Sequence, residues 1–192
     1  GGEVTRQVAR WRPDALILLC HGENSIFETL LEIEENFPGL PVYPVIADAR
    51  DLDRLNVIFE DHRPQVVFHT AAHKHVPLME INVEEAIINN VLGTRNLVET
   101  SMNYGVERMV LISTDKAIRP SSVYGATKRI SEMLVLDAAE RSGLDFSVVR
   151  FGNVLGSRGS VVPLFKRQIA QGGPITITHP DMKRYFMTIP EA

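Results

Sequence analysis

RMVLIS, residues 108–113, is followed by the polar stretch TDKAIRPSSVYGATK and then by a segment of helical period that runs to Ser142. The first six residues are nearly continuous in hydrophobicity, which is typical of a strand covered on both faces by helices. The helical segment, residues 124–142, stops before Gly143, a residue type that favours helix termination. The stretch therefore predicts a strand, a polar loop and a helix in succession.

The same alternation extends in both directions along the chain. Four more apolar runs predict strands, at residues 15–20, 42–47, 65–70 and 146–151. Three more segments of helical period predict helices at residues 26–35, 52–61 and 84–104. Repeated strand–helix units predict an α/β fold with a doubly wound parallel sheet of the Rossmann type.

The two ends of the chain differ from a complete fold of this type. A doubly wound nucleotide-binding sheet begins with a strand and a glycine-rich turn, whereas this chain begins with Gly1, Gly2 and a helical segment at residues 3–11. We therefore expect the first strand and most of the turn to be absent, the two glycines being either the end of that turn or a tag remnant. The last residues, 189–192, likewise predict no strand or helix that would complete the fold. We expect one domain over residues 1–192, with a substrate-binding part that begins near residue 151.

Composition narrows the classes of partner. The net charge is −4 and no basic run occurs, which argues against nucleic acid and against an anionic membrane surface and favours a small molecule. Cys20 is the only cysteine, so neither an intrachain disulfide nor a cysteine metal cluster can form, as suits a reducing compartment. No apolar run approaches the ~20 residues of a membrane helix. The histidines His69, His73 and His75 lack recognisable metal spacing, so we predict no metal.

Tyr124 and Lys128 are the first candidate catalytic pair. They are four residues apart at the start of a predicted helix, so their side chains share one face. An ammonium beside a tyrosine favours the phenolate and lowers the pKa of the hydroxyl, which can then exchange the proton that accompanies hydride transfer. The alternative is a surface tyrosine beside a solvated lysine.

Asp115 and Lys116 are the second candidate pair. With Ser113 and Thr114 they follow a predicted strand, at the edge where open α/β sheets bind ligands. Removal of water across two carbons needs a base for the carbon-bound proton and an acid for the departing hydroxyl, and a neighbouring ammonium and carboxyl can supply both. The alternative is a structural ion pair or a helix-capping aspartate.

Five stretches carry a family resemblance, namely FHTAAHKHVPLME, NNVLGTRN, ISTDKAIRPSSVYGATKR, RFGNVLGSRGSVVPLF and RYFMTIPEA. In this order they resemble the polysaccharide-biosynthesis family of UDP-N-acetylglucosamine 4,6-dehydratases, within the extended short-chain dehydrogenases/reductases, from about residue 47 to the end. The resemblance implies an NADP-dependent lyase in which C4 of the sugar is oxidised, water leaves from C5 and C6, and the hydride returns to C6. The product would be a UDP-4-keto-6-deoxy sugar.

The resemblance also implies roles for individual residues. Lys116 matches the base for C5, Asp115 matches the acid for the C6 hydroxyl, and Thr114 matches a hydrogen-bonding position near the C4 oxygen. Tyr124 and Lys128 match the oxidation pair, which also contacts the cofactor. Further cofactor positions are Asp48 and Ala49 at the adenine, Ala71 in the turn against the cofactor and Val154 by the nicotinamide, and substrate-contacting positions are His75, Asn153 and Arg158.

Two features depart from the family pattern. Long, membrane-anchored members commonly have methionine where this chain has Tyr124, whereas short soluble members have tyrosine. HKHVPLME and RYFMTIPEA are more similar to the long members, so retention and inversion at C5 both stay open. At the end of the strand at residues 15–20, where an NAD enzyme places a carboxylate for the ribose, this chain has Cys20. NADP is therefore the predicted cofactor, and Glu23 keeps NAD as an alternative.

Three functions of different classes follow. The dehydratase is first. A UDP-sugar 4-epimerase needs only Tyr124 and Lys128, so replacement of Asp115 would spare it. A non-catalytic nucleotide-binding module is third. We expect a UDP-sugar substrate, a homo-oligomer and a cytoplasmic catalytic domain, with an inner-membrane anchor outside this chain left open.

Overall fold

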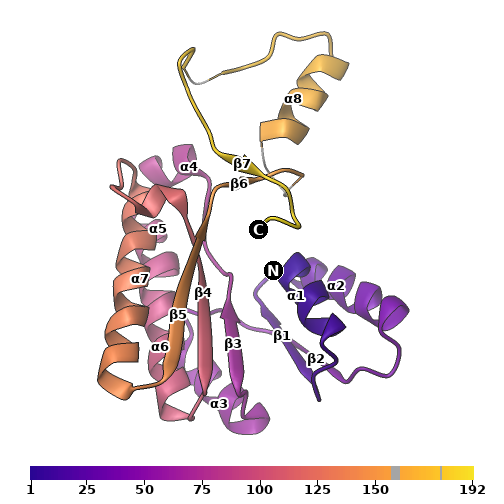
Figure 1. Cartoon of the computed structure of the whole chain (residues 1–192), viewed down its shortest axis with the longest axis vertical. Coiled ribbons are helices and arrows are strands. Elements are labelled where there is room, and N and C mark those ends of the chain that lie inside the picture. The colour runs from indigo at the N-terminus through magenta and orange to yellow at the C-terminus, as the bar shows by residue number, and fades with distance from the viewer. Residues whose placement is uncertain (157–160, 178) are drawn as a thin grey trace. The chain divides into compact units, whose positions relative to one another are not determined.

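A computed structural model of the chain describes residues 1–156, 161–177 and 179–192. The chain divides into two compact units, Gly1–Val149 and Arg150–Ala192 (Figure 1). The strands are β1 Leu16–Cys20, β2 Val42–Ile46, β3 Val66–His69, β4 Arg108–Thr114, β5 Asp145–Phe151, β6 Asn153–Val154 and β7 Phe186–Met187. The helices are α1 Gly2–Arg10, α2 Glu23–Asn36, α3 Leu52–His62, α4 Val76–Ile81, α5 Val83–Ile87, α6 Gly93–Asn103, α7 Val123–Ser142 and α8 Val161–Ala170.

The strands of the first unit confirm the predicted α/β fold. All five predicted strands form, at bounds within two residues of those expected. β1 pairs with β2 in parallel, β3 pairs with β4 in parallel, and β5 lies on the other edge of β4. In the doubly wound order 3-2-1-4-5-6, β2 and β1 fit positions 3 and 2, and β3, β4 and β5 fit positions 4, 5 and 6. Among the described residues, no strand occupies the position between β1 and β3.

Two apolar clusters cover the two faces of the β1–β2 sheet. Leu16 packs with Ala9 of α1 and Ile33 of α2. Ile17 and Leu19 pack instead against a larger cluster that includes residues of α3, α6 and α7. Successive side chains of a strand point to opposite faces, so this alternation places helices on both sides of the sheet, as a doubly wound fold requires.

The predicted helix at residues 84–104 is not continuous. It is divided into α5, a π-helical turn η1 at Ile88–Leu92, and α6. A π-helical turn accommodates one extra residue within a helix and occurs frequently at functional sites. The interruption brings Asn90 to a fully buried position, where its side chain makes the contacts described below.

Several short elements carry no periodic signal in the sequence. They are α4, the 3₁₀ turn η2 at Asp115–Ala117, α8, and the β6–β7 pair of the second unit. The boundary between the two compact units lies between Val149 and Arg150. That the second unit binds the substrate stays a prediction. Within the part of the chain that is described, no helix is both long and apolar enough to cross a bilayer.

Gly125 in the first turn of α7 permits a close approach between two parts of the chain. The side-chain oxygen of Ser122 accepts a hydrogen bond from the Gly125 amide at 3.1 Å and caps the helix. A Cβ atom at Gly125 would collide with the backbone carbonyl of Lys116 in η2. The absence of a side chain therefore allows the turn after β4 to pack directly on the start of α7.

We expect Gly125→Ala to lower the free energy of unfolding by about 1–3 kcal/mol, because the backbone of η2 has to move. Gly93→Ala is the matched control, since its Cβ would lie 3.5 Å from the Cβ of Ala49, an ordinary contact. The control should leave stability unchanged or raise it by up to about 1 kcal/mol through helix propensity. Denaturant unfolding of both variants measures the difference, and equal stabilities would contradict the described packing.

Candidate active site

The carboxyl end of β4 and the start of α7 form the centre of the candidate site. Thr114 is the last residue of β4, Asp115 and Lys116 form η2 directly after it, and Tyr124 is the second residue of α7. Gly125 allows these segments to lie against each other. A strand end and a helix start thereby bring together residues up to ten positions apart in the sequence.

Three of the five predicted catalytic residues are joined by hydrogen bonds, and Tyr124 lies next to them at the start of α7. The Thr114 hydroxyl donates to Oδ1 of Asp115 at 2.9 Å, and the same oxygen accepts a hydrogen bond from Nζ of Lys116 at 2.9 Å. Thr114 also acts on the Tyr124 hydroxyl, whose pKa it lowers. Thr114 therefore lies between the Asp115–Lys116 pair and the tyrosine.

Asp115 is an ionised carboxylate in this arrangement. Burial alone raises the pKa of its carboxyl, but the hydrogen bonds from Lys116 and Thr114 and the charge of Lys116 outweigh that effect. The pKa is therefore below its ordinary value. The pair thus rests as carboxylate and ammonium, with a direct hydrogen bond along which one proton can pass.

Tyr124 and Lys128 depart from the electrostatics expected from the sequence. Burial raises the pKa of the Tyr124 hydroxyl, the hydrogen bond with Thr114 acts in the opposite direction, and the charge of Asp115 adds to the rise. Burial lowers the pKa of Lys128 to about 8, and the charge of Glu132 partly counteracts it. The expectation of a lowered tyrosine pKa is therefore wrong for this state, because desolvation of the phenolate dominates. Tyr124 is a neutral phenol near pH 7.

Buried polar side chains link the structural elements that carry the site. The side-chain oxygen of Asn90 accepts a hydrogen bond from the amide of His73 at 2.8 Å, and its amide nitrogen donates to the carbonyl of His73 at 2.9 Å. The same nitrogen donates to Thr127 of α7 at 3.1 Å. Asn90 therefore fixes the loop after β3 to the helix that carries Tyr124 and Lys128.

The histidines of the predicted loop region have protein partners. His69 is buried, and its Nε2 lies 2.8 Å from the hydroxyl of Thr94. Burial, with a smaller effect from the charge of Lys128, lowers the pKa of His69 to about 3, so the ring is neutral. His73 contacts Glu85 at 3.3 Å. His75 is exposed and is the N-cap residue of α4.

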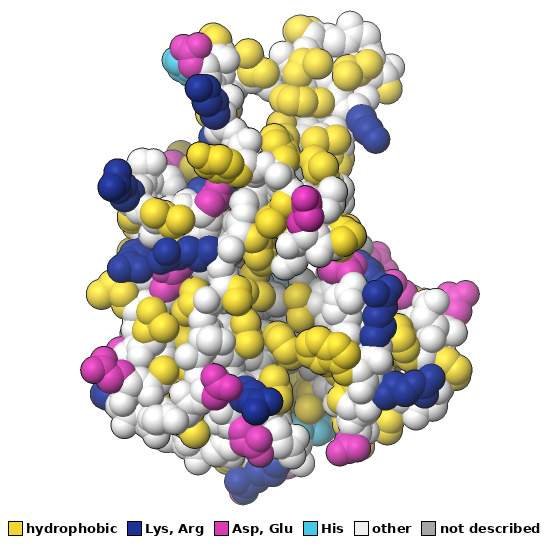
Figure 2. Space-filling view, viewed as in Figure 1, with side chains coloured by type: hydrophobic (Ala, Val, Ile, Leu, Met, Phe, Trp, Pro, Cys, Tyr) yellow, Lys and Arg dark blue, Asp and Glu magenta, His cyan; other side chains and the backbone are white. Residues whose placement is uncertain are grey.

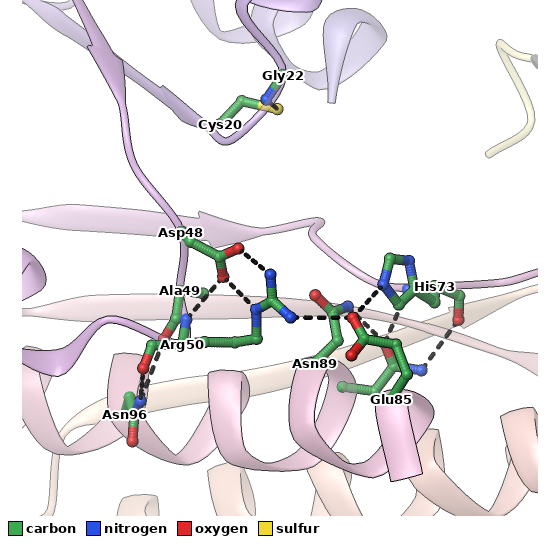
Figure 3. Close-up of polar contacts among 10 residues, drawn as sticks. Cys20, Gly22, Asp48, Ala49, Arg50, His73, Glu85, Asn89 and Asn96 are labelled. Carbon is green, nitrogen blue, oxygen red and sulfur yellow. Dashed lines mark hydrogen bonds and ion pairs between the residues drawn. The ribbon is translucent and has the colours of Figure 1, made fainter. Parts of the chain in front are cut away.

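A chain of ion pairs crosses the carboxyl end of β2 (Figure 3). The carboxylate of Asp48 receives hydrogen bonds from Nε and Nη2 of Arg50, at 3.0 and 2.7 Å. Nη1 of Arg50 donates to Glu85 at 2.9 Å, and Glu85 also meets His73. The hydrogen bonds from Arg50 lower the pKa of Asp48 below its ordinary value despite partial burial. Asp48 is therefore held ionised and oriented.

Small residues border the strand ends where a dinucleotide would lie. Ala49 packs against Gly93, and the side chain of Asn96 donates to the carbonyl of Ala49 at 3.3 Å. Ala71 is exposed in the loop after β3. Gly1, before α1, lies beside Thr70 at the end of β3. Backbone without large side chains, next to a helix N-terminus, fits the shape and charge of a nucleotide diphosphate.

The remaining predicted residues belong to the second unit. Asn153 and Val154 form β6, and the Asn153 amide donates to the carbonyl of Tyr185 at 2.9 Å. A Cβ at Gly152 would collide with that same carbonyl, so the motif RFGNV is shaped for close backbone packing. Arg158 lies outside the described residues.

Sequence reasoning missed three supporting contacts. Arg50 orients Asp48, and Glu85 links Arg50 to His73. The third contact joins Ser113 to Glu132. The position of Glu132, four residues after Lys128, was a signal in the helical spacing. Arg50 and Glu85 are 35 residues apart, and no local pattern pairs them.

The strand order and the helices on both sides of the sheet define an α/β chain of the Rossmann type. The chain belongs to the family described as polysaccharide biosynthesis protein, whose model matches residues 1–192. The sequence motifs resemble this same family, so the expected family membership is confirmed.

Individual relatives agree with the family. The chain is 54% identical to the capsular polysaccharide biosynthesis protein CapD of Staphylococcus aureus, over 100% of this chain and 32% of that protein. It is 39% identical to the UDP-N-acetylglucosamine 4,6-dehydratase (inverting) of Campylobacter jejuni strain 81-176, over 93% of this chain and 53% of the enzyme. A UDP-glucose 4-epimerase of Rickettsia rickettsii is 41% identical over 83% of this chain and 46% of its own length.

A solved structure is similar to the chain in its fold as well as in its sequence. The X-ray structure of Pen from Bacillus thuringiensis superimposes with a TM-score of 0.88 at 34% identity, over 100% of this chain and 58% of that one. The chain thus spans between about a third and about three fifths of the length of the relatives it matches.

The raised pKa of Tyr124 gives a test of the site as described. In an absorbance titration, the difference between wild type and Tyr124→Phe should show one hydroxyl that ionises above pH 10, the ordinary value for tyrosine. Because the folded-state pKa is raised, the tyrosine contributes stability below pH 10 that is lost as the pH rises further. The wild type should therefore lose stability relative to the variant above pH 10. Ionisation of Tyr124 below pH 10 would contradict the described environment.

Proposed function

We propose that the chain carries the reaction centre of a nucleotide-sugar 4,6-dehydratase that converts UDP-N-acetylglucosamine to a UDP-4-keto-6-deoxy sugar for surface polysaccharide or glycan biosynthesis. The observation that carries the proposal is the hydrogen-bonded Asp115–Lys116 pair with Thr114 on the same carboxylate oxygen, close enough to Tyr124 for Thr114 and Asp115 both to act on its pKa. An epimerase uses the tyrosine without needing an acid–base pair beside it.

NADP is the proposed cofactor, and it supplies a hydride acceptor and donor when bound. Asp48 and Ala49 would hold the adenine end, where the carboxylate is ionised by Arg50. Ala71 would lie against the cofactor, Tyr124 and Lys128 would contact its ribose side, and Val154 would lie by the nicotinamide. Cys20 at the end of β1 puts no carboxylate against a 2′-phosphate, which supports NADP over NAD.

Oxidation at C4 requires removal of the proton of the C4 hydroxyl. Tyr124 is a neutral phenol in this state, so it has to release its own proton to solvent before it can accept the proton of the C4 hydroxyl. Thr114 favours that ionisation, and the charge of Lys128, one helical turn away, would favour it too. A bound substrate would complete this arrangement, because it would exclude water and bring its C4 oxygen to Thr114.

Elimination requires the opposite proton distribution from the one at rest. Lys116 has to be a neutral amine in order to remove the C5 proton, and Asp115 has to be protonated in order to donate to the departing C6 hydroxyl. The 2.9 Å hydrogen bond from Nζ of Lys116 to Oδ1 of Asp115 is a direct path for that single proton. Transfer along it neutralises both residues, which burial under a bound sugar favours because it disfavours charge.

We assign the substrate contacts beyond the reacting carbons to His75, Asn153 and Arg158. A guanidinium can bind two phosphate oxygens at once, which suits Arg158 to the diphosphate of a UDP-sugar. The exposed position of His75 at the start of α4 leaves its ring accessible to a ligand. The homo-oligomer expected from the sequence stays a prediction, and the exposed apolar residues Ile130, Met133 and Leu136 along α7 support it.

The relatives favour two activities. The Campylobacter relative named as an inverting UDP-N-acetylglucosamine 4,6-dehydratase supports the proposal. The Rickettsia relative named as a UDP-glucose 4-epimerase supports the second candidate, a 4-epimerase. The two candidates share Tyr124 and Lys128 and differ in their need for Asp115 and Lys116.

Asp115→Asn separates the two candidates. In the intact protein with UDP-N-acetylglucosamine and NADP, we expect the variant to form the dehydrated product about 10²–10⁴-fold more slowly, because the acid is lost. Product mass measures the loss of one water. Oxidation at C4, followed as substrate-dependent reduction of the nicotinamide, should persist because Tyr124 and Lys128 are intact.

The matched control is Asp137→Asn, an exposed carboxylate of α7 paired with Arg141 at 2.8 Å. It should dehydrate the sugar at the wild-type rate. Unchanged product mass with an inverted C4 in both wild type and Asp115→Asn would establish the epimerase instead. Water loss by Asp115→Asn at the wild-type rate would refute the proposed role of the pair.

A further inference from the structure

A carboxylate lies fully buried between β4 and α7. Glu132 has no exposed surface, and its Oε1 accepts a hydrogen bond from the hydroxyl of Ser113 at 2.6 Å. Ser113 immediately precedes Thr114, and Glu132 follows Lys128 by four residues. One contact therefore joins the strand that carries Asp115 and Lys116 to the helix that carries Tyr124 and Lys128.

Glu132 continues the stripe of α7 that holds the oxidation pair. Tyr124, Lys128 and Glu132 follow one another at intervals of four residues, so they share one face of the helix. Lys128 is 3% exposed and Glu132 is 0% exposed. A buried ammonium is costly unless an opposite charge accompanies it, and Glu132 is a buried opposite charge one turn away.

The other ionisable groups near Lys128 do not replace this charge. The charge of Lys128 acts on His69 of β3, but the His69 ring is itself neutral because its pKa is about 3. Tyr124 is a neutral phenol, and Asp115 of η2 acts on Tyr124. Arg129 of α7 contacts the second carboxylate oxygen of Glu132 at 3.2 Å from a half-exposed position. The charge of Glu132 raises the pKa of Lys128 against the effect of burial.

We propose that Glu132, held by Ser113, is a positioning residue that keeps Lys128 charged and aligned beneath Tyr124. The assignment rests on the proposed function, because Lys128 matters to catalysis only where Tyr124 exchanges a proton with substrate. A merely structural tie between β4 and α7 would need a hydrogen-bond acceptor for Ser113 but no charge. The negative charge of Glu132 is therefore the property to test.

Glu132→Gln removes the charge and keeps an acceptor for the Ser113 hydroxyl, so it should fold. Arg141→Gln is the matched control, because it removes an exposed cation of α7 that pairs with Asp137 and not with Glu132. Ser113→Ala is a second test variant that frees the carboxylate from β4 and does not depend on Glu132→Gln folding. The intact protein with isotopically labelled lysine reports the pH at which Lys128 loses its proton, with Lys128→Met assigning the resonance.

We expect the Lys128 titration to fall by about one pH unit in Glu132→Gln, to fall by less in Ser113→Ala, and to stay unchanged in Arg141→Gln. The alkaline limb of turnover with UDP-N-acetylglucosamine should move down by the same amount in Glu132→Gln. A Lys128 titration that stays in place in both Glu132→Gln and Ser113→Ala would overturn the inference.

The two proposals fail separately. If the wild type does not turn over the sugar nucleotide but Lys128 still shifts in Glu132→Gln, the proposed function is wrong and the positioning of Lys128 by Glu132 holds. If the wild type dehydrates the sugar and Lys128 does not shift, the function holds and the role of Glu132 is refuted.

Discussion

The close packing of η2 on the first turn of α7 is the constraint on which the candidate site depends. Gly125 leaves room for the carbonyl of Lys116, and Ser122 caps the helix at the same place. This contact gathers the end of β4, a proton-carrying pair and a tyrosine at one edge of a parallel sheet. Figure 2 shows apolar side chains between scattered charged side chains on the face in view.

The protonation states of the site at rest are the starting point of the proposed reaction. Tyr124 is neutral, Lys128 titrates at about 8, and Asp115 and Lys116 rest as an ion pair. In the proposed reaction Tyr124, Asp115 and Lys116 would each have to change protonation. The direct hydrogen bond within the Asp115–Lys116 pair would let one proton pass between those two residues without bulk water.

The sequence predicted the strands, the long helix α7 and the residues of the polar loop, because these depend on local periodicity and on motifs. It did not predict the π-helical turn that buries Asn90, since the extra residue of that turn is compensated by contacts with His73 and Thr127 from other elements. It predicted the wrong direction for the pKa of Tyr124 because spacing indicates a neighbouring ammonium but not the burial of the phenol. The pairing of Ser113 with Glu132 depends on how far β4 and α7 are buried, which no local pattern specifies.

The proposed reaction requires one site both to oxidise C4 and to eliminate water from C5 and C6. UDP-N-acetylglucosamine with deuterium at C4, incubated with the intact protein and NADP, tests it most directly. The account predicts a dehydrated product that carries the deuterium at C6, because the hydride removed from C4 is returned there. A product that has lost no water and carries the deuterium at C4 would contradict it.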